Sequence, residues 1–309
     1  MPPLIPRAVI VTRPTDYEAL LARYATRAQV RFALKESGES LDVLNIRHRK
    51  VEEAIETVAH GIPPTWRTVR LTRSELDRFI FEPSDIVLVV GQDGLVANVA
   101  KYLEGQPVIG FNPDPQLYEG VLVANEPAQS GQLIQEVASS TASFEQRTMV
   151  QATLQDGQSL TALNEIFVGH RSHQSARYRI RLDQREERQS SSGVIISTGT
   201  GNTGWARSIN SERKAPLTLP KPTETDLVLF VREAFPGRGF QATLTGAVLR
   251  KRDVALITSE MDDSGVIFGD GIEDDGVYFG WGSRVVIGIA SHTLKLVVGT
   301  SSSHFKDAA

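Results

Sequence analysis

The apolar run DIVLVV at residues 85–90 leads straight into Gly91-Gln92-Asp93-Gly94. A continuous apolar strand is typical of a parallel sheet that is covered by helices on both faces. The residues that follow predict a helix over 95–103 and a further strand over 107–111. This strand–helix–strand order predicts an α/β domain and so limits the folds open to the first part of the chain.

The rest of the first part alternates in the same way. Apolar residues at helical spacing predict helices over 16–31 and 45–60, and a short helix is expected over 74–79. Short β-branched runs predict strands over 8–12 and 68–71. We therefore expect residues 1–128 to form a Rossmann-like, three-layer α/β domain.

The second part, residues 129–290, has a different pattern. Its strand signals are short, rich in β-branched residues and separated by Gly, Asp and Asn. Such spacing predicts a mostly antiparallel, β-sandwich-like domain. Residues 291–309 are expected to add a C-terminal strand and a tail.

Four polar stretches of the second part are predicted to be turns. Asp156-Gly157 and Asp275-Gly276 have the composition of two-residue hairpin turns. The charged stretches at 185–188 and 273–275 are expected to be an exposed hairpin tip and a solvated turn.

Composition excludes several classes of protein. The 309 residues include no cysteine, which excludes disulfides, cysteine metal sites and a thiol nucleophile. The formal net charge of −4 provides no overall basic field for nucleic acid. His170 and His173 have no third ligand nearby and are expected on a surface loop.

No targeting or membrane segment is predicted. The first seven residues lack the apolar segment of a secretory signal, and a strand from residue 8 leaves no room for a transit peptide. No apolar stretch approaches the roughly 20 residues that span a bilayer. We expect a cytoplasmic protein whose partner is a small molecule, neither nucleic acid nor membrane.

The loop Gly91-Gln92-Asp93-Gly94 is the first candidate for chemistry. A strand that ends in glycine and opens a helix presents backbone N–H groups to an anion, because the helix dipole favours negative charge there. An Asp at this place is also positioned to contact a ribose hydroxyl or a metal. The alternative is an ordinary Asp-Gly turn after a strand.

The second candidate is the stretch from Ser197 to Trp205, where three glycines alternate with hydroxyl-bearing residues. Glycine lets a backbone approach a ligand closely, and hydroxyls bond sugar or phosphate oxygens. A flexible loop before a helix is the alternative. The third candidate is the pair Asn164-Glu165, which is costly inside an apolar strand unless it is satisfied or functional, although a strand edge would explain it too.

Taken together and in their order along the chain, the three motifs resemble those of the NAD kinase family. Its hallmarks are a Gly-Gly-Asp-Gly-Thr loop after an apolar strand, an Asn-Glu pair, and a Ser-Thr-Pro-Thr-Gly-Ser-Thr-Ala-Tyr loop. The chain is most similar to the mitochondrial-type branch, through the motifs at 11–18, 109–120 and 191–205. The likeness covers nearly the whole chain.

The resemblance implies transfer of a phosphoryl group from ATP or polyphosphate to the 2′-hydroxyl of the adenosine ribose of NAD. It implies Mg²⁺ held with the nucleotide rather than by protein ligands, and a homo-oligomer, dimer or tetramer. Asp93 would be the catalytic carboxylate. The phosphate loop would comprise Gly91, Gln92, Gly94 and Leu95. The dinucleotide would be bound by Asn112, Asp114, Asn164, Glu165, Ser192, Thr198, Thr200, Thr203, Gly204, Trp205 and Ser208.

Two residues depart from the family pattern. Gln92 stands where the family has its second glycine, and Leu95 replaces the threonine. Both fall on the loop for the phosphoryl donor. They keep open a second hypothesis, a non-catalytic regulatory protein that binds NAD(H) or NADP(H). A kinase for another hydroxylated small molecule is the third.

Overall fold

The computed structural model describes residues 5–35 and 38–299 and divides the chain into two compact units. The N-terminal unit is Met1–Glu145 with Lys295–Ala309, and the β unit is Gln146–Leu294. Residues 1–4, which belong to the stretch predicted to lack a secretory signal, lie outside the described residues. So does the predicted tail from residue 300.

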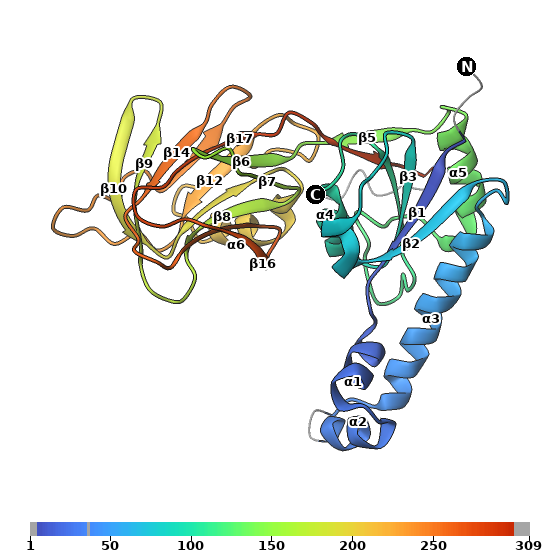
Figure 1. The fold of residues 1–309 in the computed structure, drawn as a ribbon. Coiled ribbons are helices and arrows are strands. Elements are labelled where there is room, and N and C mark those ends of the chain that lie inside the picture. The colour runs from blue at the N-terminus through green and yellow to red at the C-terminus, as the bar shows by residue number, and fades with distance from the viewer. Residues whose placement is uncertain (1–4, 36–37, 300–309) are drawn as a thin grey trace. The chain divides into compact units, whose positions relative to one another are not determined.

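A six-stranded sheet forms the centre of the N-terminal unit (Figure 1), and its order is β2-β1-β3-β4-β18-β5. The printed pairs of β1 with β2 and β3, of β3 with β4, and of β4 with β18 are all parallel. All six residues of β3 are buried, as an apolar run without alternation requires. The strands are β1 (Arg7–Thr12), β2 (Arg67–Thr72), β3 (Asp85–Val90), β4 (Pro107–Phe111), β5 (Phe144–Arg147) and β18 (Leu294–Val297).

The helix predicted over 16–31 is in fact two helices, α1 (Asp16–Tyr24) and α2 (Arg27–Leu34). The break lies at Ala25, whose φ of 61° is left-handed, and Thr26 then caps α2 through a bond from the N–H of Gln29. Periodicity alone missed this break because the apolar spacing continues across it.

Helix α3 (Leu41–His60) belongs to two apolar clusters. Leu41 and Leu44, in its first half, pack with Tyr17 of α1 and Val30 of α2. The second half packs against the sheet through Ala54, Ile55 and Val58. Figure 1 shows α1 and α2 beside the first half of α3, away from the parallel sheet, and we call these three helices the helical arm.

Helix α5 (Ser130–Ala138) extends the N-terminal unit beyond the predicted boundary at residue 128. Its Leu133 and Ile134 are buried in the same cluster as Ile109 and Phe111 of β4, and this packing holds the helix in the first unit. The remaining helices of this unit are α4 (Asp93–Ala100) and the 3₁₀ helices η1 (Arg73–Arg78) and η2 (Pro127–Gln129).

The β unit contains two six-stranded sheets, ordered β10-β9-β14-β17-β6-β7 and β13-β12-β11-β8-β15-β16. Their printed strand pairs are antiparallel, and one apolar cluster draws on the inner faces of both sheets. The expected fold class, α/β followed by antiparallel β, is confirmed. The strands are β6 (Val150–Leu154), β7 (Ser159–Ala162), β8 (Glu165–His170), β9 (Ala176–Leu182), β10 (Arg185–Ser191), β11 (Val194–Ser197), β12 (Leu227–Val231), β13 (Gly246–Leu249), β14 (Ala255–Ser259), β15 (Gly265–Gly269), β16 (Ile272–Tyr278) and β17 (Arg284–Ile289), with η3 (Gly201–Thr203) and α6 (Trp205–Ser211) after β11.

Three of the four predicted turns are strands. Residues 185–188 begin β10, where the carboxylate of Glu187 is buried and accepts bonds from the N–H groups of Thr243 and Leu244. Residues 273–276 lie within β16, and the turn is instead Asp270-Gly271, where both residues have positive φ. Charge content misled because β16 is the edge strand of its sheet and exposes Glu273, Asp274 and Asp275 in succession. The Asp156-Gly157 hairpin is where the sequence predicted it.

Among the residues that the structure describes, no helix is long and apolar enough to span a membrane.

Candidate functional site

The order of the parallel sheet places a crevice at the ends of β1 and β3. Strand β1 has β2 on one side and β3 on the other. The connection after β1 and the connection after β3 therefore lead to opposite sides of the sheet, which makes the ends of β1 and β3 a switch point. Open α/β sheets bind ligands outside the carboxyl ends of strands at such a switch point. A pocket of about 50 Å³ lies there, lined by Arg13, Arg47, His48, Gly91 and Gln92 among others. We call it the switch-point pocket.

Asp93 is the first residue of α4, and its carboxylate is already bonded on both oxygens. One oxygen accepts from the N–H groups of Leu122 and Val123, at 2.8 and 3.2 Å, and the other from Val121 at 3.0 Å. A carboxylate offers about four acceptor positions, so one remains. Asp93 therefore holds the segment 121–123 as well as presenting a charge.

The two residues that depart from the family pattern have different surroundings. Gln92 is half-buried, and its side-chain oxygen accepts from Arg13 Nη2 at 3.0 Å. Leu95 is 1% exposed and packs beneath Gly91. Gln92 therefore faces the switch-point pocket, while Leu95 belongs to the core. The exposed Gly94 has no atom near its missing side chain, so packing does not require a glycine there.

Asn112 and Asp114 follow β4 and are buried. The amide of Asn112 donates to the carbonyl of Tyr118 at 2.8 Å and accepts from the N–H of Asp114 at 3.0 Å. Asp114 forms an ion pair with Lys50 of α3 at 2.9 Å. Both side chains thus fasten the segment after β4, and the structure brings them to the same unit as Asp93.

In the β unit, Asn164 and Glu165 lie where β7 passes into β8. The N–H groups of Leu163 and Asn164 donate to the two carboxylate oxygens of Asp270, at 3.2 and 2.7 Å. Burial, together with the negative charge of Asp270, raises the pKa of Glu165 to about 7. A carboxylate with this pKa changes its charge near neutral pH.

The loop after β11 contains buried polar atoms of two kinds. The hydroxyl of Thr198 donates to the carbonyl of Leu163 at 2.6 Å and accepts from the N–H groups of Thr200 and Gly201. Thr200 Oγ1 and Asn202 Oδ1, by contrast, are buried without a hydrogen-bond partner. Unpaired buried polar atoms are unfavourable and are frequently functional. Thr198 therefore supports the loop, whereas Thr200 and Asn202 retain bonding capacity.

The glycines of this loop have different roles. A side chain at Gly199 would meet the carbonyl of Lys221 at 2.0 Å, and one at Gly201 would meet that of Asn164 at 2.3 Å. These two glycines are required because other backbone segments approach them. Gly204 is exposed, and the nearest atom to an added Cβ would be 3.8 Å away. Only Gly204 is therefore free for close approach of a ligand.

Trp205 begins α6 and stacks on Phe167, with ring centroids 5.9 Å apart. The guanidinium of Arg232 lies 4.7 Å from the Trp205 ring centroid. The N–H of Ser192 donates to the carbonyl of Arg232, which brings the turn before β11 to the same face. Thr203 and Ser208 are exposed on the loop and on α6.

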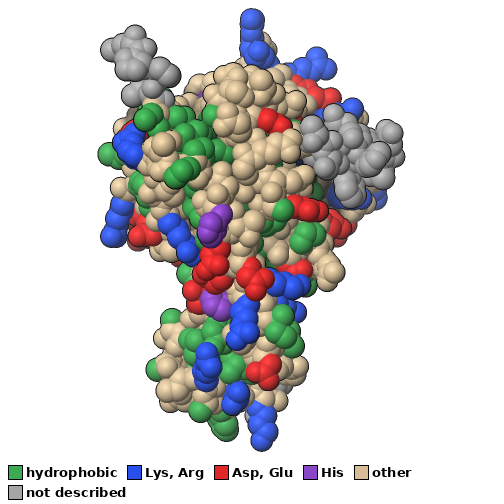
Figure 2. All heavy atoms as spheres, turned by 90° about the vertical axis from the view of Figure 1, so that its right-hand side faces the viewer, with side chains coloured by type: hydrophobic (Ala, Val, Ile, Leu, Met, Phe, Trp, Pro, Cys, Tyr) green, Lys and Arg blue, Asp and Glu red, His purple; other side chains and the backbone are tan. Residues whose placement is uncertain are grey.

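One group of three possible metal ligands occurs among the described residues, Glu18, His48 and Glu52 of the helical arm. Glu18 completes the capping box of α1 with Thr15, and Glu52 pairs with Arg70 at 3.4 Å. Figure 2 shows acidic and histidine side chains gathered on one face of the molecule. Capping and ion pairing account for these carboxylates, and we assign no metal to them.

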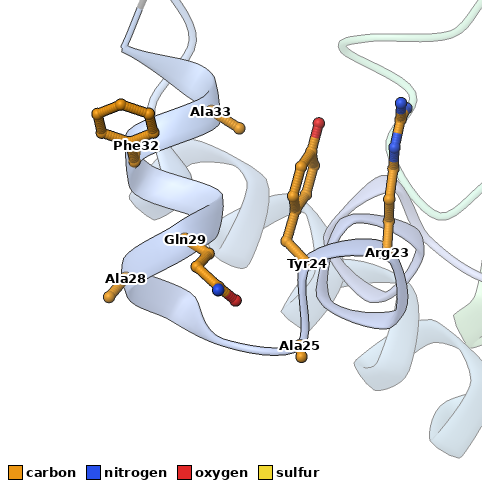
Figure 3. Close-up of a pocket in the computed structure, with 7 residues that line it drawn as sticks. All are labelled: Arg23, Tyr24, Ala25, Ala28, Gln29, Phe32 and Ala33. Atoms are coloured by element: carbon orange, nitrogen blue, oxygen red, sulfur yellow. The ribbon is translucent and has the colours of Figure 1, made fainter.

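A second hollow lies on the helical arm, and none of the predicted site residues lines it. It measures about 620 Å³ and is lined by Tyr24 of α1 and by Ala28, Phe32 and Ala33 of α2, among others (Figure 3). Phe32 is 80% exposed.

Sequence reasoning missed Arg13, Asn202, Arg232 and Asp270. Arg13 directly follows β1, and attention to strand ends would have found it. Asp270 lies more than 100 residues from Asn164, and no local pattern links them.

Comparison with known proteins gives sequence matches to NAD kinases. The NAD kinase of Chlorobaculum tepidum is 29% identical over 142 residues, which are 44% of this chain and 47% of that protein. The mitochondrial NAD kinase 2 of Rattus norvegicus is 24% identical over 320 residues, covering 77% of this chain and 75% of the rat protein. The chain thus spans about half the length of the first of these relatives. No protein-family model matches the chain.

Solved structures give the same result for the fold. Yeast NADH kinase in complex with NADH superposes with a TM-score of 0.60 at 16% identity, covering 99% of this chain and 90% of the yeast chain. An Archaeoglobus fulgidus NAD kinase in complex with ATP gives 0.58 at 18% identity, with 96% and 94% covered. The family resemblance inferred from the three motifs is confirmed.

Proposed function

We propose that this chain, a relative of the NAD kinases in sequence and in fold, phosphorylates NAD. The phosphoryl group of ATP, or of another donor such as polyphosphate, passes to the 2′-hydroxyl of the adenosine ribose. The observation that carries the proposal is the loop after β3. It places the carboxylate of Asp93 and the unobstructed Gly94 at the start of α4, at the switch point of the sheet.

In this proposal Asp93 orients the ribose hydroxyl and accepts its proton. Three N–H groups hold the carboxylate in one position and leave one acceptor site for the hydroxyl. The backbone of Gly91, Gln92 and Gly94 borders the phosphates, and Arg13 adds a positive charge beside them. Catalysis of this kind depends on positioning and on charge stabilisation.

Mg²⁺ would enter with the nucleotide and would neutralise charge on the transferred phosphoryl group. The residues present fit an ion held by phosphates. Asp93, the carboxylate at the start of α4, is largely committed to backbone N–H groups. We therefore assign the ion no side-chain ligand.

For the dinucleotide, we propose that Asn164 and Glu165 bind the adenosine half. Thr200, Thr203, Gly204, Trp205 and Ser208 would line its site, together with Ser192, and Asn112 and Asp114 would contribute from the N-terminal unit. The unpaired Thr200 Oγ1 supports this assignment, because a ligand hydroxyl or phosphate oxygen would complete its bonding. A cytoplasmic location and a homo-oligomeric state remain parts of the proposal.

The test is to incubate the purified protein with NAD and Mg²⁺ and to assay for NADP. Parallel reactions contain ATP, other nucleoside triphosphates or polyphosphate, and NADH replaces NAD in a second series. We expect NADP or NADPH with at least one donor. Absence of product with every donor rejects the kinase.

The bond between Arg13 and Gln92 favours a second candidate, a non-catalytic regulatory protein that binds NAD(P)(H). This bond places two side chains at the pocket where a donor phosphate would bind. Calorimetry separates the candidates. The regulatory protein binds the dinucleotide without binding ATP, and competent ATP binding rejects it.

A further inference from the structure

The connection between β7 and β8 is held from both sides by residues that are distant in sequence. Asp270 accepts from the N–H groups of Leu163 and Asn164. Thr198 bonds the carbonyl groups of the same two residues, through its hydroxyl to Leu163 at 2.6 Å and its N–H to Asn164 at 2.9 Å. Every backbone polar group of Leu163 and Asn164 is therefore bonded.

Asp270 is also bonded to Glu165. Its own N–H donates to the carbonyl of Glu165 at 3.0 Å. It occupies a two-residue turn between β15 and β16, with φ of 56° at Asp270 and 69° at Gly271. Turn chemistry explains an Asp at this position but does not explain why both carboxylate oxygens point to another connection.

We propose that Asp270 is a positioning residue for dinucleotide binding, which fixes the backbone from which the side chains of Asn164 and Glu165 project. The inference rests on the proposed function, since Asn164 and Glu165 are its adenosine-binding pair. Two bonds to one carboxylate restrict the backbone conformation of the connection between β7 and β8. Charge-assisted hydrogen bonds such as these are stronger than neutral ones. The same carboxylate acts on the ionisation of Glu165, because it helps raise the pKa of that side chain.

The chain offers a matched control at Asp156-Gly157. This Asp also occupies a hairpin turn of the β unit, and its carboxylate bonds only the N–H and the side chain of Gln158. Asp156→Asn removes a turn carboxylate that has no bond to a distant connection. Asp270→Asn and Asp270→Gly both tolerate the positive φ of the turn, so either variant retains its local conformation.

The first experiment is amide hydrogen exchange on the protein without nucleotide. We expect the N–H groups of Leu163 and Asn164 to exchange at least about tenfold faster in both Asp270 variants than in the parent and in Asp156→Asn. Unchanged exchange at these two amides overturns the proposal. This readout does not depend on whether the protein binds NAD.

The second experiment is calorimetric titration with NAD from about pH 5 to pH 9. We expect about tenfold weaker binding in both Asp270 variants. If ionised Glu165 accepts from ribose, affinity falls as pH drops through its pKa. Asp270→Asn removes a neighbouring negative charge, which lowers that pKa and moves the fall to lower pH. Unchanged affinity for NAD in both Asp270 variants overturns the proposal, whereas equal weakening at every pH supports positioning through the backbone alone.

Failure of the parent protein to bind NAD would reject the proposed function, while the exchange experiment would still decide the role of Asp270 in the connection.

Discussion

The loops after β3 and after β11 follow the same plan and differ in how their polar groups are bonded. Each succeeds a fully buried strand and precedes a short helix. In the first, Asp93 is bonded to three N–H groups and Gln92 to Arg13. In the second, Thr200 Oγ1 and Asn202 Oδ1 are buried without partners. The side chains of Gln92 and Asp93 in the first loop are bonded to other segments, and the second loop retains two buried acceptors without partners.

This difference shows which loop stabilises the protein and which loop has groups left to bind a ligand. A buried polar atom without a partner costs about 1–3 kcal/mol. The loop after β11 therefore carries a cost that a ligand can remove, whereas the loop after β3 contributes to the stability of its unit. Loss of the bonded Asp93 carboxylate should reduce stability and activity together, whereas loss of the unpaired Thr200 hydroxyl should weaken binding without reducing stability.

The largest effect is expected from Asp93→Asn. An amide cannot accept all three N–H bonds or take up a proton, so we expect the rate of NADP formation to fall at least about 100-fold. The free energy of unfolding should fall by about 1–3 kcal/mol, because the segment 121–123 loses its acceptor. Chemical denaturation and initial rates measure the two effects. Asp77→Asn, in the exposed part of η1, is the control. Loss of activity at unchanged stability would contradict the structural half of this prediction.

Leu95→Thr and Gln92→Gly distinguish the roles of the two residues that depart from the family pattern. Leu95 is buried, so the change should lower the free energy of unfolding by about 2 kcal/mol. Gln92→Gly touches only the pocket and Arg13 and should be nearly neutral in stability. Urea denaturation of both variants is the measurement. If Gln92→Gly alone increases NADP formation, Gln92 limits access of the donor. Equal destabilisation by both changes would show that Gln92 is also a packing residue.

Glu165→Gln should lower the affinity for NAD and, above neutral pH, raise the free energy of unfolding. The pKa of Glu165 in the folded protein is about 7, above its ordinary value of 4.5. The folded state therefore binds the proton more tightly, and this stabilisation is present below about pH 4.5 and is lost as pH rises through 7. At pH 8 we expect Glu165→Gln to be more stable than the parent by about 2 kcal/mol, with no gain at pH 4. Its affinity for NAD should be about tenfold lower. Thermal denaturation at both pH values and calorimetry test this, and a gain independent of pH would exclude burial of the charge as its cause.

The smallest effect is expected from Thr200→Val. The hydroxyl has no partner, so an apolar group of the same shape should raise the free energy of unfolding by about 1 kcal/mol, the low end of the cost of an unpaired buried group. Affinity for NAD should fall only a few-fold, by about one hydrogen bond. Thr198→Val is the matched change, because its hydroxyl makes three bonds and its loss should destabilise the unit. If the two variants behave alike, the contrast between bonded and unbonded hydroxyls is wrong.

Local patterns predicted much of the fold. The strands β3 and β4 have the residues that their apolar runs indicated, because strand signals depend on neighbours in the sequence. The break at Ala25 was missed because it depends on one left-handed residue inside a continuous apolar period. The charged residues 185–188 predict a hairpin tip, and the strand could not be predicted because the bonds that satisfy Glu187 come from the distant Thr243 and Leu244.

The candidate site, too, could be predicted from the sequence only in part. Residue types and spacing predicted Asp93 and the loop after β11 as candidates. Which of their atoms are bonded could not be found, because the partners of Asp93 lie at 121–123 and those of Asn164 at Asp270. The opposite surroundings of Gln92 and Leu95 likewise depend on tertiary packing rather than on their order in the loop.

The position of β18 has a consequence for how the protein is made. This strand pairs with β4 through Lys295 and Leu296 and stands between β4 and β5 in the sheet. On the ribosome, β4 lacks this neighbour until residues 294–297 have been translated, which is after the rest of the β unit, and β5 has no neighbouring strand in the sheet before then. The N-terminal unit is therefore begun before the β unit and completed after it, and until then part of the edge of β4 is open to pairing with other chains.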